Sequence, residues 1–210
     1  FLFLFFLLNC FMKHALQKII SFILLIFFSP IFMILSLLIF FSDGLPILFK
    51  QNRLGRNGKI FKCMKFRSMK KNAEDILKNN PDLMKIYVEN GYKIPEELET
   101  RYLGIGLFLR KSSLDELPQL INVLKGDMNL VGPRPIVPNE ISHYKGIKKD
   151  QFLSMRPGMT GLWQISGRSN IDYPERVDFE ISYLKKRSFL FDIYVLFKTL
   201  LVVFKKDGAH

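Results

Sequence analysis

Two adjacent acidic side chains, Asp115 and Glu116, stand in the mostly apolar stretch Ser112-Ser113-Leu114-Asp115-Glu116-Leu117-Pro118-Gln119-Leu120. Consecutive residues point in different directions, so neighbouring carboxylates can do different work. One can attack an electrophile as a nucleophile, while the other helps to hold a metal ion. We therefore treat Asp115 and Glu116 as a candidate reactive pair, called the dyad below.

The residues after the dyad predict how it is presented. Proline suits the first position of a helix, and glycine commonly ends one. We therefore expect a helix from Pro118 to Lys125 that ends at Gly126. The dyad then precedes the positive end of this helix, where anions are favoured. A capping box between Ser113 and Glu116 explains the same spacing without chemistry, and both interpretations stay open.

Basic side chains gather in two further stretches. Residues 59–69 alternate basic and apolar side chains, which predicts a strand with one cationic face. This face would either bind phosphate or form a solvated strand edge. A short apolar strand over Met128–Val131 leads into Gly132-Pro133-Arg134-Pro135. Two prolines stiffen that turn, and a guanidinium matches phosphate oxygens in a bidentate way, so Arg134 is either a phosphate ligand or part of an ordinary surface turn.

The segment from Arg156 to Arg168 is rich in glycine and contains Trp163. Backbone amides can approach a ligand closely in such a loop, and Arg168 is a candidate phosphate ligand. Trp163 is expected to be a packing or interfacial residue. The sequence contains no Walker loop and no dinucleotide fingerprint, so we do not interpret these glycines as a nucleotide-binding motif of either kind.

The net charge of +12 suggests anionic partners such as phosphate esters, an anionic membrane face or nucleic acid. The two cysteines form neither a metal-binding spacing nor a disulfide framework, which fits a reducing compartment. A chain of 210 residues suits one domain plus an appendage.

An apolar run from Ile19 to Phe41 has the length of a bilayer crossing and is interrupted by Ser29-Pro30, where we expect a kink. Basic residues flank the run on both sides, and such residues tend to stay cytoplasmic. A re-entrant helix that returns through the same leaflet and a kinked spanning helix are both open. Residues 189–204 predict an amphipathic helix on the membrane face or a core helix.

These features suggest three segments. Residues 13–49 would form the membrane helix and residues 50–210 a small domain of mostly helical α+β class with interfacial amphipathic helices. Because Met12-Lys13-His14 resembles a natural start, residues 1–12 are expected to be an upstream artefact or a remnant of a preceding membrane segment.

The ordered motifs resemble those of the bacterial sugar transferases, the monotopic phosphoglycosyl transferases. The resemblance covers about residues 13–209. The motifs that carry it are the helix broken at Ser29-Pro30, the Lys65–Met69 stretch, Arg110–Leu120, Asn122–Met128, Gly132–Pro135 and Arg156–Arg168. Together they are far more specific than any one of them. Ile136-Val137, Leu162-Trp163-Gln164 and the Lys-Asp-Gly-Ala ending are similar to the undecaprenyl-phosphate hexose-1-phosphate transferases.

The resemblance implies a Mg²⁺-dependent enzyme of the bacterial inner membrane, with its catalytic domain on the cytosolic face. It would move a sugar-1-phosphate, of galactose or glucose, from a UDP-sugar to undecaprenyl phosphate and release UMP. This would be the first membrane step of O-antigen, capsule or exopolysaccharide synthesis, with downstream glycosyltransferases as possible partners.

Asp115 matches the nucleophile, which would form a covalent phosphosugar-aspartate, and Glu116 matches the acid that helps to hold Mg²⁺. The basic residues expected around the phosphates are Lys65, Arg110, Arg134 and Arg168, to which we add Arg67 and Gln164 from the matching motifs. The family's membrane helix is re-entrant with its break at Ser29-Pro30, which favours the hairpin.

Two other functions fit parts of the pattern. A membrane-tethered basic adaptor for nucleic acid or anionic lipid fits the charge and the apolar anchor, but the sequence holds no recognisable nucleic-acid module. A two-carboxylate metal phosphatase fits the dyad and would need no prenyl phosphate acceptor.

Overall fold

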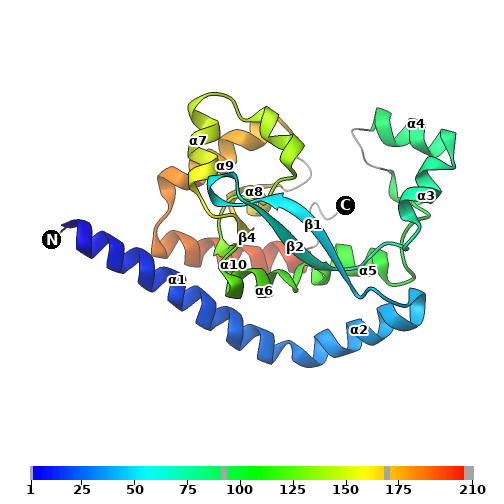
Figure 1. Ribbon diagram of the computed structural model, residues 1–210, viewed down its shortest axis with the longest axis horizontal. Coiled ribbons are helices and arrows are strands. Elements are labelled where there is room, and N and C mark those ends of the chain that lie inside the picture. Colours follow the sequence, from blue (N-terminus) through cyan, green and yellow to red (C-terminus); the bar gives the residue numbers. More distant parts are fainter. Residues whose placement is uncertain (1, 91–93, 168–170, 206–210) are drawn as a thin grey trace.

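The computed structural model describes residues 2–90, 94–167 and 171–205 (Figure 1). It is a mostly helical α+β structure, as predicted. Its strands are β1 (Leu48–Leu54), β2 (Ile60–Phe66), β3 (Asn129–Val131) and β4 (Gly158–Thr160). Its helices are α1 (Leu2–Phe27), α2 (Ser29–Asp43), α3 (Ala73–Lys78), α4 (Pro81–Glu89), α5 (Gly106–Lys111), α6 (Gln119–Lys125), α7 (Ile147–Ser154), α8 (Leu162–Ser166), α9 (Glu175–Lys186) and α10 (Phe189–Lys205).

The predicted break at Ser29-Pro30 is confirmed. Helices α1 and α2 meet there at a bend of 61°, measured over His14–Phe27 and Ser29–Asp43. The Ser29 hydroxyl donates a hydrogen bond to the carbonyl of Ile26 at 2.8 Å, and Pro30 has no N–H to continue the helical ladder. Within the described residues no single helix is long and apolar enough to cross a bilayer, whereas this bent pair reaches that length and apolarity together.

Both arms of the bent pair contact the same domain, along whose lower edge they run in Figure 1. On α1, the Gln17 side chain accepts a hydrogen bond from the Leu130 amide at 2.8 Å, and the buried Ser21 hydroxyl donates to the Leu120 carbonyl at 2.8 Å. On α2, Leu35 and Ile39 are buried in the main hydrophobic core. The domain therefore holds the helix pair on both sides of its break.

The strand expected in residues 59–69 is β2, which pairs with β1 as an antiparallel hairpin. The expectation of one cationic face is wrong. Side chains alternate between the two faces of a strand, so Lys65 shares a face with Phe61 and Cys63, and Lys62 lies on the other. Because Phe61 and Cys63 are buried, this arrangement turns Lys65 toward the interior of the domain.

The predicted strand over 128–131 is β3, which pairs in parallel with β4. Two glycines of the segment from Arg156 to Arg168 make room for this pairing, and the expectation that the segment binds a ligand stays a prediction. A Cβ added to Gly158 would lie 2.0 Å from the Gly132 amide nitrogen, and one added to Gly161 would lie 2.0 Å from the Gly132 carbonyl oxygen. These glycines let the loop lie directly against the turn that carries Arg134.

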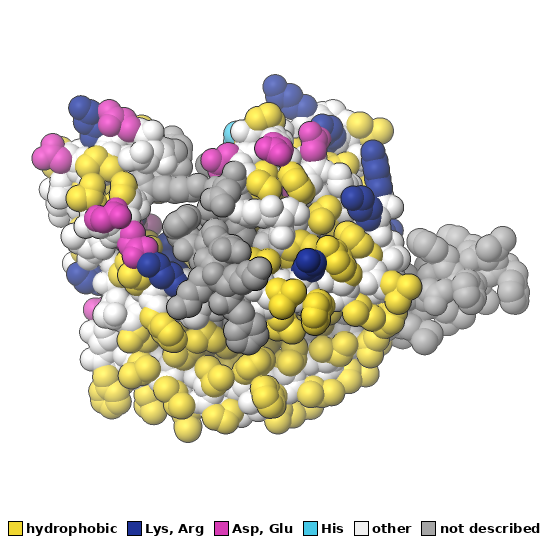
Figure 2. All heavy atoms as spheres, turned by 180° about the vertical axis from the view of Figure 1, so that it is seen from behind, with side chains coloured by type: hydrophobic (Ala, Val, Ile, Leu, Met, Phe, Trp, Pro, Cys, Tyr) yellow, Lys and Arg dark blue, Asp and Glu magenta, His cyan; other side chains and the backbone are white. Residues whose placement is uncertain are grey.

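The helix predicted in residues 189–204 is α10. Val195 is fully buried, whereas several large apolar side chains of the same helix are exposed. Figure 2 shows an apolar band along the lower edge of the molecule, where α1 and α2 lie in Figure 1. The exposed apolar residues of these three helices include Ile19, Phe22, Ile23, Ile26, Phe27, Met33, Ile34, Leu37, Leu38, Phe40, Phe41, Phe189, Leu190, Ile193, Tyr194, Phe197, Leu200 and Leu201.

Candidate active site

The dyad lies in a one-turn 3-10 helix, Leu114–Glu116, directly before α6. As predicted, α6 starts beside Pro118 and ends at Gly126, which has a φ of 85°. The capping-box alternative is wrong, because the Ser113 side chain makes no capping hydrogen bond. Ser113 instead has a φ of 57°, a left-handed conformation that turns the chain between α5 and the dyad.

Asp115 is 7% exposed. Burial raises the pKa of Asp115 to about 6, and the neighbouring Lys65 charge is the strongest influence in the opposite direction. Arg110 and Arg134 also favour the ionised form, whereas Glu116 disfavours it. Asp115 is therefore a desolvated carboxyl group whose ionised form is favoured by three nearby cations, and an ionised carboxylate is chemically able to act as a nucleophile.

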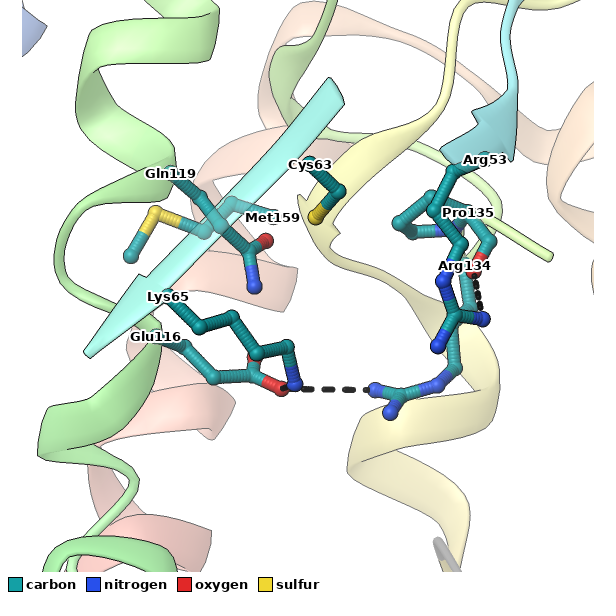
Figure 3. A pocket seen from close by; sticks show the side chains of 8 residues that line it. All are labelled: Arg53, Cys63, Lys65, Glu116, Gln119, Arg134, Pro135 and Met159. Carbon is teal, nitrogen blue, oxygen red and sulfur yellow. Dashed lines mark hydrogen bonds and ion pairs between the residues drawn. The ribbon is translucent and has the colours of Figure 1, made fainter. Parts of the chain in front are cut away.

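Lys65 joins the two acids. Its Nζ lies 2.7 Å from Oε1 of Glu116 and 3.9 Å from Oδ2 of Asp115. Arg134 approaches the same Glu116 oxygen, with Nη1 at 3.8 Å. The hairpin, the dyad turn and the Gly132–Pro135 turn thus bring two cations and two acids together, and an ion pair across this group is drawn in Figure 3. These four residues were predicted from the sequence and lie up to 69 positions apart, counting from Lys65 to Arg134.

A small pocket opens beside this cluster (Figure 3). The sequence analysis picked out Lys65, Glu116 and Arg134 from its lining but missed Arg53, Cys63 and Gln119. The lining comprises Arg53, Cys63, Lys65, Glu116, Gln119, Arg134, Pro135 and Met159. Arg53 on β1 pairs with Phe61 on β2, and Phe61 is two residues before Cys63. Pairing β1 with β2 in the sequence would therefore have placed Arg53 near the pocket.

The other predicted ligands are placed differently. Arg110 is close enough for its charge to lower the pKa of Asp115, but its guanidinium contacts Ser68 and Met69. Arg67 is buried and bonds to the Asp43 carboxylate and to the carbonyls of Pro46 and Gly44, which ties the end of α2 to the domain. The structure thus gives Arg67 an anchoring task away from the dyad.

Two predicted ligands come from the glycine-rich segment. Gln164 is buried in α8, and both polar atoms of its amide are without a hydrogen-bond partner among the described residues. The prediction for Arg168 lies outside the described residues. Trp163 is buried, as the packing role requires, and its ring lies beneath the guanidinium groups of Arg134 and Arg176, 5.3 and 4.4 Å from the ring centre.

The two carboxylates are a plausible donor set for Mg²⁺. In the described parts of the chain no group of three or more His, Cys, Asp or Glu residues is arranged to hold a metal. Mg²⁺ typically takes one or two protein carboxylates and completes its coordination with phosphate oxygens and water. The dyad therefore fits an ion that arrives with a phosphorylated substrate, but not an ion held in a cage of protein ligands alone.

The chain is similar in sequence to known bacterial proteins. Residues 8–206 match the family model described as bacterial sugar transferase. The chain is 44% identical over 203 residues to an undecaprenyl-phosphate galactose phosphotransferase of Salmonella typhimurium, covering 95% of this chain and 42% of that protein. It is 40% identical over 202 residues to the exopolysaccharide production protein ExoY of Sinorhizobium fredii, covering 94% and 88%. It is 34% identical over 209 residues to a UDP-glucose:undecaprenyl-phosphate glucose-1-phosphate transferase of Escherichia coli, covering 96% and 42%. The chain thus spans less than half of the length of the first and third relatives.

Proposed function

Since this chain belongs to the bacterial sugar transferase family, we propose that it transfers a sugar-1-phosphate from a UDP-sugar to undecaprenyl phosphate and releases UMP. The observation that carries the proposal is the buried Asp115 carboxylate with Lys65 beside it and Arg134 bound to its neighbour Glu116. Relatives named as galactose phosphotransferase and glucose-1-phosphate transferase support UDP-galactose or UDP-glucose as the donor.

The reaction divides into two displacements. An Asp115 carboxylate oxygen attacks the phosphorus that bears the sugar, the bond from this phosphorus to the bridging oxygen breaks, and the electron pair leaves with UMP. A phosphate oxygen of undecaprenyl phosphate then attacks the same phosphorus and releases the Asp115 carboxylate. Two displacements let one site serve two bulky anions in turn.

The cations around the dyad address the repulsion between an anionic nucleophile and a diphosphate. Lys65 and Arg134 can stabilise negative charge on the leaving phosphate. Bound through Asp115 and Glu116, Mg²⁺ would supply additional positive charge at the diphosphate oxygens. Cation–π contact with Trp163 and ion pairing with Glu116 would keep the Arg134 guanidinium at the site before substrate arrives.

The exposed apolar faces of α1, α2 and α10 support a membrane location for the site. Both arms of the bent pair contact one domain, so we propose that the pair enters and leaves the bilayer on the same side as a re-entrant helix. The catalytic domain would then lie on the cytosolic face of the inner membrane. A prenyl phosphate keeps its headgroup at the bilayer surface, so a site beside these helices could reach it without extracting the lipid.

A UMP-release assay with purified protein, Mg²⁺, undecaprenyl phosphate and a panel of UDP-sugars tests the proposal. We expect release with UDP-galactose or UDP-glucose, and a mass increase of one hexose phosphate on Asp115 when the acceptor is left out. Asp115→Asn should abolish both signals, because the amide is a poor nucleophile. Near-normal turnover by Asp115→Asn would remove the nucleophile assignment, and steady release of free sugar phosphate without acceptor would favour a phosphatase instead.

A further inference from the structure

The turn that carries Arg134 is held by backbone contacts on each side. The Gly132 amide donates to the Thr160 carbonyl at 2.9 Å, and the Gly158 amide donates to the Pro133 carbonyl at 2.8 Å. After the turn, the Leu54 amide donates to the Ile136 carbonyl at 2.9 Å. The middle of the turn, from Arg134 to Pro135, has to be held by side chains instead.

Two charged side chains of opposite sign hold this middle part. The Arg134 amide donates to both carboxylate oxygens of Glu180, at 3.2 and 3.1 Å. One residue later, Nη1 of Arg53 donates to the Pro135 carbonyl at 3.0 Å. Arg53 comes from β1 and Glu180 from α9, so elements far apart in sequence hold consecutive residues of one turn.

Both side chains are fixed in their own places. Glu180 is fully buried, and its Oε1 lies 3.8 Å from Nε of Arg176. The Arg53 guanidinium donates to the Gln51 side chain at 2.6 and 3.1 Å. Glu140 links the two groups, with one oxygen 3.9 Å from Arg53 and the other 3.9 Å from Arg176. Alternating charges therefore run from Arg53 through Glu140 and Arg176 to Glu180.

Burying these ionisable side chains costs free energy, which their contacts have to offset. Burial and the nearby Arg134 charge lower the pKa of Arg53, so the two guanidinium groups repel one another. Burial also raises the pKa of Glu180 to about 7. A buried charge without a partner is strongly destabilising, and each of these groups is directed at the turn backbone. The side chain that projects from this turn reaches Glu116 and Trp163.

We propose that Arg53 and Glu180 are positioning residues that hold the turn between them and so fix the Arg134 guanidinium beside the dyad. The inference rests on the proposed function for its readout, but it concerns residues outside the dyad. Arg53 and Glu180 act through Arg134: their loss lowers turnover by letting the guanidinium leave its place, and both become dispensable once Arg134 itself is removed.

A double-mutant cycle tests this dependence. Arg53→Met is compared in the natural chain and in an Arg134→Ala background, with Arg56→Met as the matched control because Arg56 is exposed. We expect Arg53→Met to lower kcat/KM about tenfold or more in the natural chain, since small misplacements of a catalytic group are costly. In the Arg134→Ala background it should cost less than about twofold, as expected for coupled residues. The Arg53→Met and Arg134→Ala single variants should divide their losses in the same way between kcat and KM.

Glu180→Leu, with Glu175→Gln as its exposed control on α9, repeats the cycle from the other side of the turn. Partial unfolding would lower activity equally in both backgrounds, so it would leave an additive pattern. Additive losses for Arg53 or for Glu180 overturn the proposal and, for Arg53, point to direct contact with substrate phosphate. If the natural chain releases no UMP, the proposed function fails; if it is active and the losses add, only the positioning role fails.

Discussion

Replacing Glu180 by glutamine should change how the stability of the folded domain depends on pH. Glu180 is fully buried, and its pKa is raised from 4.5 to about 7 because burial outweighs the attraction of Arg176 and of the Arg134 amide and side chain. A carboxyl whose pKa is raised on folding binds its proton more tightly in the folded state. Its contribution to stability is therefore complete below about pH 4.5 and is lost as the pH rises through about 7.

The size of the effect follows from the shift. Each pKa unit corresponds to about 1.4 kcal/mol, so the natural chain should lose about 3 kcal/mol through this group between pH 4.5 and pH 8. For a chain of this length that corresponds to about 6–12 °C in Tm. Glutamine mimics the protonated acid and cannot ionise, so Glu180→Gln should lack this loss.

Thermal unfolding in a fixed detergent, followed by circular dichroism from pH 4.5 to 8, measures both proteins. The difference between the two curves isolates Glu180, because Asp115 and the other titrating groups are common to both. Glu175→Gln, which changes an exposed acid on the same helix, is the control and should follow the natural chain. Parallel curves for Glu180→Gln and the natural chain would refute the reasoning and would mean that Arg176 and Arg134 keep Glu180 ionised throughout.

Three other perturbations follow from the structure. Lys65→Met should lower kcat about 100-fold in the UMP-release assay, because it removes the ammonium next to both acids, and a loss below threefold would contradict this role. Arg67→Met should lower the Tm, because it removes hydrogen bonds to the Pro46 and Gly44 carbonyls, each of which contributes about 0.5–1.5 kcal/mol; an unchanged Tm would contradict the anchoring role. Cysteines placed at His14 and Lys50, with Cys10 replaced by serine, should both react with an impermeant maleimide from the cytosolic side of membrane vesicles. Labelling from opposite sides would exclude the re-entrant helix.

Much of the site was predictable because its signals are local. Pro118 and Gly126 set the ends of α6 through the dihedral angles that proline and glycine favour. Pro30 has no backbone N–H to donate, and this marks the bend between α1 and α2. Each of these effects acts within a few residues of its cause, so the order of residues is enough to predict it.

The roles of charged residues were harder to predict, because a charge alone does not specify its partner. Lys65 lies in β2 and Arg67 follows directly after the strand. Lys65 nevertheless pairs with Glu116 of the dyad, whereas Arg67 bonds to the end of α2. The sequence did not predict that Gly158 and Gly161 of the glycine-rich segment make room for the backbone of Gly132. In each case the outcome depended on which distant element packs against the residue.

The sequence by itself determined the adjacent acids Asp115 and Glu116, the basic residues Lys65 and Arg134 that lie beside them, and the break between α1 and α2. Only the tertiary structure decided that Arg53 and Glu180 hold the Arg134 turn, across separations of 82 and 46 residues. The physical reason is that burial and pairing of charges depend on contacts made by packing of whole helices and strands, and a pattern of neighbouring residues does not contain those contacts.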